Sequence, residues 1–187
     1  MSTVIELGEV NDAGQAPALT GVSIDLRALE LVAHWGRCGL TADWLARFFA
    51  YDFAPGSREA AVSVLSTAIN ELLENAAKFC SDKQHPVRIS VRHHGDFVRI
   101  ATGNTAGDNH VQRLRTTLDQ LSHGSLEELF TRLMQNKSAP GASGIGLLIL
   151  KKDYGARLAV RLAPLAAAGE WDVQVTADLD IAEVEQT

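Results

Sequence analysis

The segment AINELLENAAKF, residues 68–79, places a carboxylate, an amide and an amine on one side of an otherwise apolar pattern. Around it, apolar residues recur with three- and four-residue spacing, which predicts a helix with one buried stripe. The stripe consists of Val62, Leu65, Ile69, Leu72, Ala76 and Phe79. Glu71, Asn75 and Lys78 follow the same spacing, so their side chains should line up along the border of the apolar stripe.

This row of polar side chains has a chemical interpretation. The amide oxygen of Asn75 can ligate Mg²⁺, a hard cation that prefers oxygen donors and shares its shell with water and phosphates. A carboxylate one turn earlier, Glu71, could orient or deprotonate a nucleophile beside that metal. The alternative is that Glu71, Asn75 and Lys78 are the solvated edge of an amphipathic helix.

A glycine-rich segment lies further along the chain. Gly141, Gly144 and Gly146 precede the apolar run Leu147–Leu150, which predicts a loop that opens into a helix. Glycines let backbone N–H groups wrap phosphate oxygens, and the helix N-terminus adds a partial positive charge. The alternative is a flexible loop before a tight helix start.

With both motifs in view, the chain resembles the Bergerat-fold (GHKL) ATPases of the gyrase, Hsp90, histidine kinase and MutL group. Residues 71–79 resemble the N box, and Gly144, Ile145, Gly146 and Leu147 resemble the second glycine box. The resemblance implies ATP and Mg²⁺ as cofactors, with Asn75 on the metal, Lys78 nearby and Glu71 as the base. It implies an α+β fold, a two-layer sandwich whose mixed, mostly antiparallel sheet is covered on one face by helices. The order of segments is most similar to anti-sigma-factor Ser/Thr kinases of the SpoIIAB, RsbW and SiaB types.

One family motif departs from its pattern. The first glycine box should be a strand ending in Asp-x-Gly-x-Gly, whose carboxylate receives the adenine amino group. Here the predicted strand of residues 97–102 leads into Gly103 and Asn104. The amide oxygen of Asn104 can accept the same hydrogen bond without the charge that strengthens it. The alternative is an ordinary turn in a protein that has lost nucleotide binding.

Length and composition fit one domain. The chain of 187 residues divides into an N-terminal extension, residues 1–37, the family-like core, and an acidic tail, residues 178–187. A net charge of −6 disfavours nucleic acid as a partner, because that binding needs Lys and Arg. The sequence has no membrane-length apolar run and no basic, apolar leader, so we expect a cytoplasmic protein whose two cysteines are reduced.

The remaining patterns complete the expected sandwich. Strands are predicted at 87–91, 97–101, 156–162 and 171–177, and helices at 110–121 and 125–134, in the lid region of the family. Aromatic residues cluster just before the N-box helix, and core packing is favoured over a protein-binding surface for them. They are Trp35, Trp44, Phe48 and Phe49.

Two functions from different classes remain open. The first is a protein Ser/Thr kinase that transfers phosphate from ATP to a small STAS-type anti-sigma-factor antagonist or another signalling protein. The intact pair of Glu71 and Asn75 favours it. The second is a non-catalytic partner-switching module, gated by nucleotide or free of it, which the altered first glycine box favours. Homodimerisation is compatible with either.

Overall fold

One long helix organises the fold. The computed structural model describes residues 3–11, 17–135 and 144–185, and in it helix α3 runs from Arg58 to Phe79. The side chains that α3 buries recur every three or four residues, as predicted, although Val62 and Phe79 at the ends of the predicted stripe are only partly buried. The buried set is Ala61, Val64, Leu65, Ala68, Ile69, Leu72, Leu73, Ala76 and Ala77. Each fully buried leucine or isoleucine stabilises the fold by about 1.5–3 kcal/mol, so α3 is the main anchor of the core.

The other elements follow in an α+β order. The strands are β1 Ile5–Gly8, β2 Thr20–Arg27, β3 Pro86–His93, β4 Phe97–Gly107, β5 Arg157–Pro164 and β6 Glu170–Asp180. The other helices are α1 Ala28–Ala33, α2 Gly36–Phe49, α4 Asp108–His123, α5 Leu126–Gln135, α6 Ile145–Asp153 and α7 Ile181–Val184, with short 3-10 turns at Ala50–Asp52 and Pro55–Ser57.

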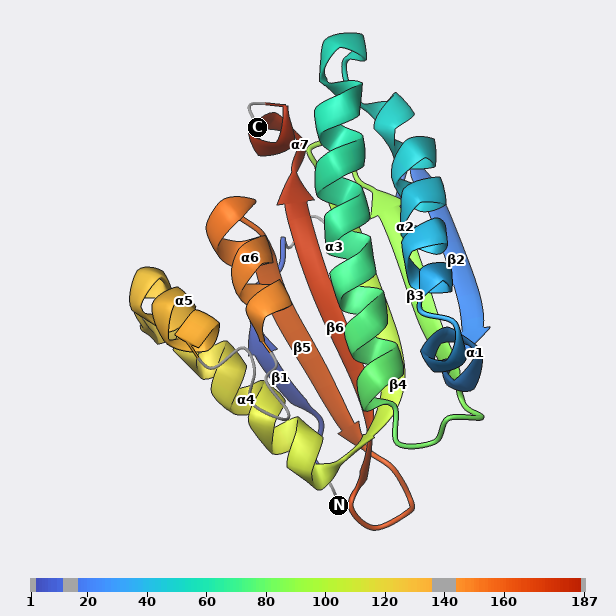
Figure 1. The fold of residues 1–187 in the computed structure, drawn as a ribbon, viewed down its shortest axis with the longest axis vertical. Coiled ribbons are helices and arrows are strands. Elements are labelled where there is room, and N and C mark those ends of the chain that lie inside the picture. The colour runs from blue at the N-terminus through green and yellow to red at the C-terminus, as the bar shows by residue number, and fades with distance from the viewer. Residues whose placement is uncertain (1–2, 12–16, 136–143, 186–187) are drawn as a thin grey trace.

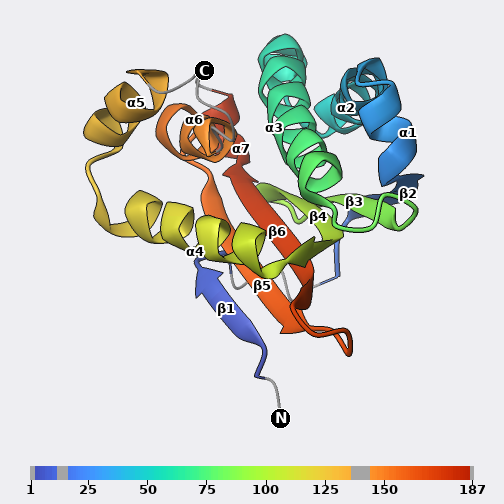
Figure 2. The ribbon, with the colours of Figure 1, turned by 60° about the horizontal axis from the view of Figure 1, so that its bottom comes forward.

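The strands form one six-stranded sheet in the order β1-β5-β6-β4-β3-β2, and each neighbouring pair is antiparallel. Helices α2 to α6 lie on the same side of this sheet, with α3 over its middle (Figures 1 and 2). Strand side chains alternate between the two faces, so residues such as Ile89, Ile100 and Ala177 meet the helices. This confirms the predicted two-layer α+β sandwich covered on one face by helices, and the sheet, expected to be mixed and mostly antiparallel, is antiparallel at every strand pair.

Strand β4 differs from its prediction. A strand of residues 97–102 followed by a turn was expected, but β4 continues without interruption to Gly107. The reason is β6, which pairs with every residue of β4 and places Asn104 opposite Val173. Gly103 is therefore part of a strand, and Asn104 projects from the sheet instead of from a loop.

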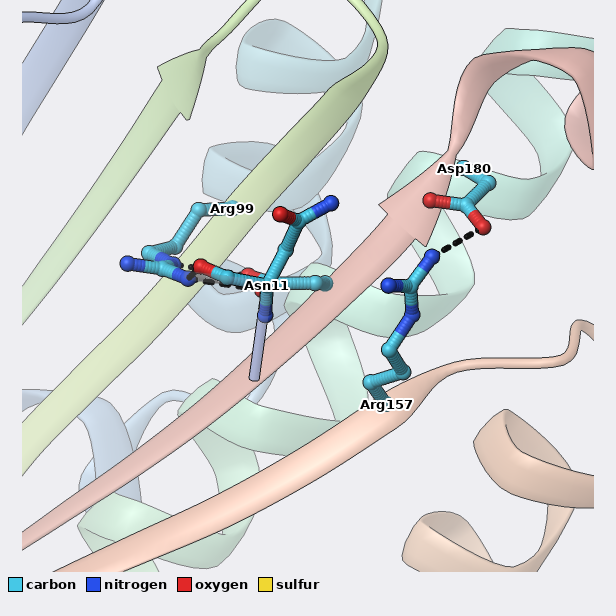
Figure 3. A network of polar contacts seen from close by, with 5 residues as sticks. Asn11, Arg99, Arg157 and Asp180 are labelled. Atoms are coloured by element: carbon cyan, nitrogen blue, oxygen red, sulfur yellow. Dashed lines mark hydrogen bonds and ion pairs between the residues drawn. The ribbon is translucent and has the colours of Figure 1, made fainter. Parts of the chain in front are cut away.

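The N-terminal segment belongs to the same sheet. Its two strands, β1 and β2, form opposite edges, and Asn11, just after β1, lies on the face that the helices leave uncovered. The chain touches that face at Asn11, whose backbone N–H donates to Asp178 Oδ2 at 2.6 Å and whose carbonyl accepts from Arg99 Nη2 at 2.8 Å (Figure 3). Neither expected boundary marks a structural unit, since residues 5–8 and 20–27 are sheet strands and residues 178–180 complete β6.

A buried ion pair holds Asn11 against the sheet. Asp178 has a fully buried side chain and binds the guanidinium of Arg99 through both carboxylate oxygens at 2.7 Å. The hydrogen bonds to Asp178 raise the pKa of the Arg99 guanidinium. A second pair, Arg157 with Asp180, lies beside it on the neighbouring strands (Figure 3). Because a buried carboxylate needs its partners, Arg99 and Asn11 together make the burial of Asp178 tolerable.

Candidate functional site

A pocket lies between α3, the central strands, α4 and the start of α6. The space in it that is open to water-sized molecules is small, about 40 Å³, and the pocket opens partly to solvent. Most of its lining is apolar, with a few polar groups between, which is the usual composition of a small-molecule site. The lining residues are Leu72, Asn75, Ala76, Phe79, Thr102, Asn104, His110, Leu114, Thr117, Gly144, Leu147, Val173 and Val175.

Helix α3 supplies one wall of this pocket. Leu72, Asn75, Ala76 and Phe79 stand on the same side of the helix because they are spaced by three and four residues. Leu72 and Ala76 are buried, whereas Asn75 is half-buried and lines the cavity. A ligand in the pocket would therefore contact Asn75, as the sequence predicted.

The start of α6 forms the opposite wall. Gly144 precedes the helix with a φ of 97°, and a Cβ there would lie 3.0 Å from Thr117 Cγ2. This left-handed conformation and the close neighbour both favour glycine. Leu147 is buried and lines the pocket, while Ile145 is half-buried outside its lining. The predicted Gly141 lies outside the described residues.

Glu71 lies next to the pocket, against the first turn of α6. A Cβ added to Gly146 would lie 2.0 Å from Glu71 Oε2 and 3.2 Å from Glu71 Cβ, so the carboxylate packs directly on that glycine. Burial raises the pKa of Glu71, and the nearby charge of Glu74 adds to the effect. The carboxylate is thus held at the end of α6 that the predicted phosphates would occupy, since a helix N-terminus attracts anions.

Asn104 and Lys78 take different positions. Asn104 is 5% exposed, and its Nδ2 donates to the carbonyl of Thr105 at 2.9 Å. The amide oxygen is therefore the group left for a ligand. Lys78 is exposed, with its Nζ 5.1 Å from the centroid of the Phe79 ring, at the rim of the pocket instead of in its lining.

His110, which the sequence did not single out, also lines the pocket. Its ring stacks on Phe79 with centroids 4.1 Å apart and an angle of 12° between the planes. Its Nδ1 is buried and has no hydrogen-bond partner. Burial lowers the pKa of His110 to about 4, with a smaller contribution from Arg113, so the ring is neutral at pH 7. No local pattern marked this residue, because its contact with Phe79 depends on how α4 follows β4.

The pocket and its surroundings show limited charge. Among the residues that the structure describes, no carboxylate lines the pocket, and no group of three or more His, Cys, Asp or Glu could hold a metal. The residues present are still compatible with Mg²⁺, because Asn75 offers one oxygen and this ion normally takes the rest from phosphates and water. Cys38 and Cys80 are free and buried, as expected for reduced thiols.

Comparison with known proteins gives a likeness of fold. No family model matches the chain, and no curated protein matches it. A chain of the crystal structure of the SiaB–SiaC complex from Pseudomonas aeruginosa is similar, with a TM-score of 0.59 and 13% identity over 84% of this chain and 89% of that chain. At this identity the likeness shows the fold alone, and it agrees with the SiaB-type order of segments predicted from the sequence. Within the described part of the chain, no helix combines the length and apolarity needed to cross a bilayer.

Proposed function

We propose that this protein is a cytoplasmic signalling regulator that binds ATP with Mg²⁺ in the α3–α6 pocket and phosphorylates a small partner protein. The observation that carries the proposal is the meeting of two separate motifs in one place. Asn75 of α3 and Gly144 of the α6 start line the same pocket, and Glu71 contacts Gly146 beside it. The likeness to a chain of the SiaB–SiaC complex supports a protein partner, which by family resemblance is a STAS-type anti-sigma-factor antagonist.

In this proposal the adenine ring of ATP enters the apolar part of the pocket. Phe79 and His110 give a flat stacked wall, and the free amide oxygen of Asn104 accepts a hydrogen bond from the adenine amino group. This neutral acceptor replaces the carboxylate of the family motif. Because a neutral hydrogen bond is roughly half as strong as a charge-assisted one, we expect modest affinity for adenine.

The phosphates would then extend toward the first turn of α6, with Lys78 at the rim. Bound Mg²⁺ would be held by Asn75 and would neutralise phosphate charge. Glu71 takes the proton of the acceptor Ser or Thr hydroxyl as its oxygen attacks the γ-phosphorus and ADP leaves. The raised pKa of Glu71 suits this role, because a general base works best when its pKa lies nearer the working pH.

One observation favours a second candidate, a nucleotide-gated binding module without turnover. The Glu71 carboxylate packs against Gly146 in the first turn of α6, so a phosphate that approached this turn would have to displace it. If nucleotide binding displaces Glu71 and no proton transfer follows, Glu71 acts as a structural switch and not as a general base.

Two measurements test these functions. Thermal shift with ATP, ADP and Mg²⁺ tests the pocket, because ligand at 100 times its Kd adds about 2.7 kcal/mol of stability. Labelled ATP incubated with a STAS-type protein encoded beside this chain tests transfer. We expect Glu71→Gln to bind ATP yet lose transfer by a factor of about 10² to 10⁴, whereas exposed Glu59→Gln behaves as wild type. If the melting temperature does not change with ATP, ADP and Mg²⁺, both candidates are wrong. If the protein binds ATP and the partner but no phosphorylated partner forms, only the binding module remains.

A further inference from the structure

The candidate pocket has two distinct ends, which the spacing of its helical residues defines. His110, Leu114 and Thr117 of α4 line it at intervals of four and three residues, so they share one face of the helix. The step from His110 to Thr117 covers about 10 Å along the helix axis. His110 stacks on Phe79 at the end where the proposed function places the adenine ring. Thr117 therefore lies toward the opposite end of the pocket.

The end with Thr117 is also the end where α6 begins. Helix α6 lies between α3 on one side and α4 and α5 on the other (Figure 1). The three heavy atoms nearest to a Cβ built on Gly144 all belong to Thr117, and its hydroxyl oxygen would be 3.5 Å from that Cβ. From α3, Glu71 packs on Gly146. Thr117 and Glu71 thus approach the first turn of α6 from two different helices.

The hydroxyl of Thr117 is available to a ligand. Three other helical threonines, Thr67, Thr116 and Thr131, donate their hydroxyls to the carbonyl four residues earlier. Thr117 follows Thr116 directly on α4, yet within the described residues its hydroxyl makes no hydrogen bond. Its side chain is half-buried and lines the pocket. A hydroxyl in this position can donate one hydrogen bond to a ligand oxygen.

The lining of the pocket makes such a donor important for phosphate. Among the residues that the structure describes, no lysine or arginine lines the pocket. Phosphate oxygens in it must therefore be met by neutral donors and by the bound metal. A hydroxyl that donates to an ionised oxygen forms a shorter and stronger bond than one between neutral groups. Thr117 is the polar lining residue that packs on the glycine before α6.

We propose that the Thr117 hydroxyl donates a hydrogen bond to the terminal phosphate of the bound nucleotide and so makes the pocket select ATP over ADP. This inference rests on the proposed function, because it needs a nucleotide whose phosphates extend toward the start of α6. With the adenine ring beside His110, the group that reaches Thr117 is the far end of the molecule. ADP is one phosphate shorter and leaves this hydroxyl to water.

Titration calorimetry of the full chain with Mg²⁺-ATP and with Mg²⁺-ADP tests the selectivity. Thr117→Val keeps the side-chain shape and the methyl contact with Gly144 but has no donor. We expect its Kd for ATP to rise about tenfold and its Kd for ADP to change by less than about twofold. Thr116→Val is the matched control, because that hydroxyl is exposed and donates to the Gln112 carbonyl. We expect this control to bind both nucleotides as wild type does.

Two smaller side chains at the same position give a second comparison. Thr117→Ser keeps the hydroxyl and Thr117→Ala removes it, so the two variants differ only in the donor. Neither adds bulk against Gly144, and the comparison holds even if the valine variant fails to fold. We expect the serine variant to keep the preference of wild type for ATP and the alanine variant to lose it. Circular dichroism without nucleotide checks that each variant is folded.

The outcomes separate this inference from the proposed function. If wild type binds neither nucleotide, the proposed function is wrong and the role of Thr117 fails with it. If wild type binds ATP, but the valine and alanine variants keep its preference for ATP over ADP, only the role of Thr117 is wrong. An equal rise of both Kd values in Thr117→Val also overturns the role, because it shows that the side chain only packs in the wall of the pocket.

Discussion

Acid should destabilise this protein through His110. The unfolded chain binds a proton at this imidazole below a pKa of 6.5, whereas the folded protein resists it until about pH 4. Between these values the unfolded state holds more protons, so the free energy of unfolding falls as the pH falls. From pH 7 to 5 the two pKa values give about 2 kcal/mol, at about 1.36 kcal/mol per pKa unit. Because part of the ring meets solvent, we expect about 1 kcal/mol.

The assay is urea unfolding followed by tryptophan fluorescence at pH 7, 6 and 5. His110→Phe is the comparison, because phenylalanine keeps an aromatic ring against Phe79 and cannot titrate. Carboxylates lose stability with acid equally in both proteins, so the difference between their pH profiles isolates His110. Wild type should lose about 1 kcal/mol more than the variant between pH 7 and 5. Parallel profiles would refute the burial of a neutral imidazole in the pocket.

Three further perturbations address the site and the sheet. Asn75→Ala should abolish the strengthening of ATP binding by Mg²⁺ while leaving metal-free ADP binding within about twofold, as titration calorimetry would show; a retained Mg²⁺ effect would remove Asn75 from the metal site. Arg99→Met should lower the free energy of unfolding by about 3–5 kcal/mol in chemical denaturation, and adding Asp178→Leu should recover most of it; equal instability of the double variant would contradict the buried pair. Gly146→Ala should cost about 1–3 kcal/mol in the same assay because its Cβ meets Glu71, and Glu71→Ala should relieve this loss. A Gly146→Ala protein as stable as wild type would show that Glu71 moves freely.

The sequence predicted the parts of the fold that depend on local periodicity. The repeat of apolar residues along α3 is set by helix geometry, so the helix and the position of Asn75 at the core border followed from it. The full length of β4 did not, because Gly103 and Asn104 favour a turn when considered alone. Their strand conformation depends on β6, which is far away in the sequence.

The aromatic residues of α2 show a second limit of local patterns. Trp44 and Phe48 are 52% and 46% exposed, so the expectation that they are core residues was wrong. The helix has two stripes of apolar residues, and either could have faced α3. The stripe with Cys38, Ala42 and Ala46 is the buried one, because small side chains let the two helices approach closely. Periodicity alone does not rank two stripes by how well they pack against a neighbour. For the same reason the contact of Phe79 with His110 could not be predicted from either residue.

The pairing of β1 at the edge of the sheet constrains when this protein can fold during its synthesis. Ile5 pairs with Leu162, so β1 is synthesised long before β5, the strand with which it pairs. Arg99 likewise waits for Asp178, which arrives later still. Until then the outer edge of the growing sheet and a future buried arginine stay in water, and the N-terminal strand can be held by a chaperone. Synthesis must therefore have passed β5 before the sheet closes at that edge.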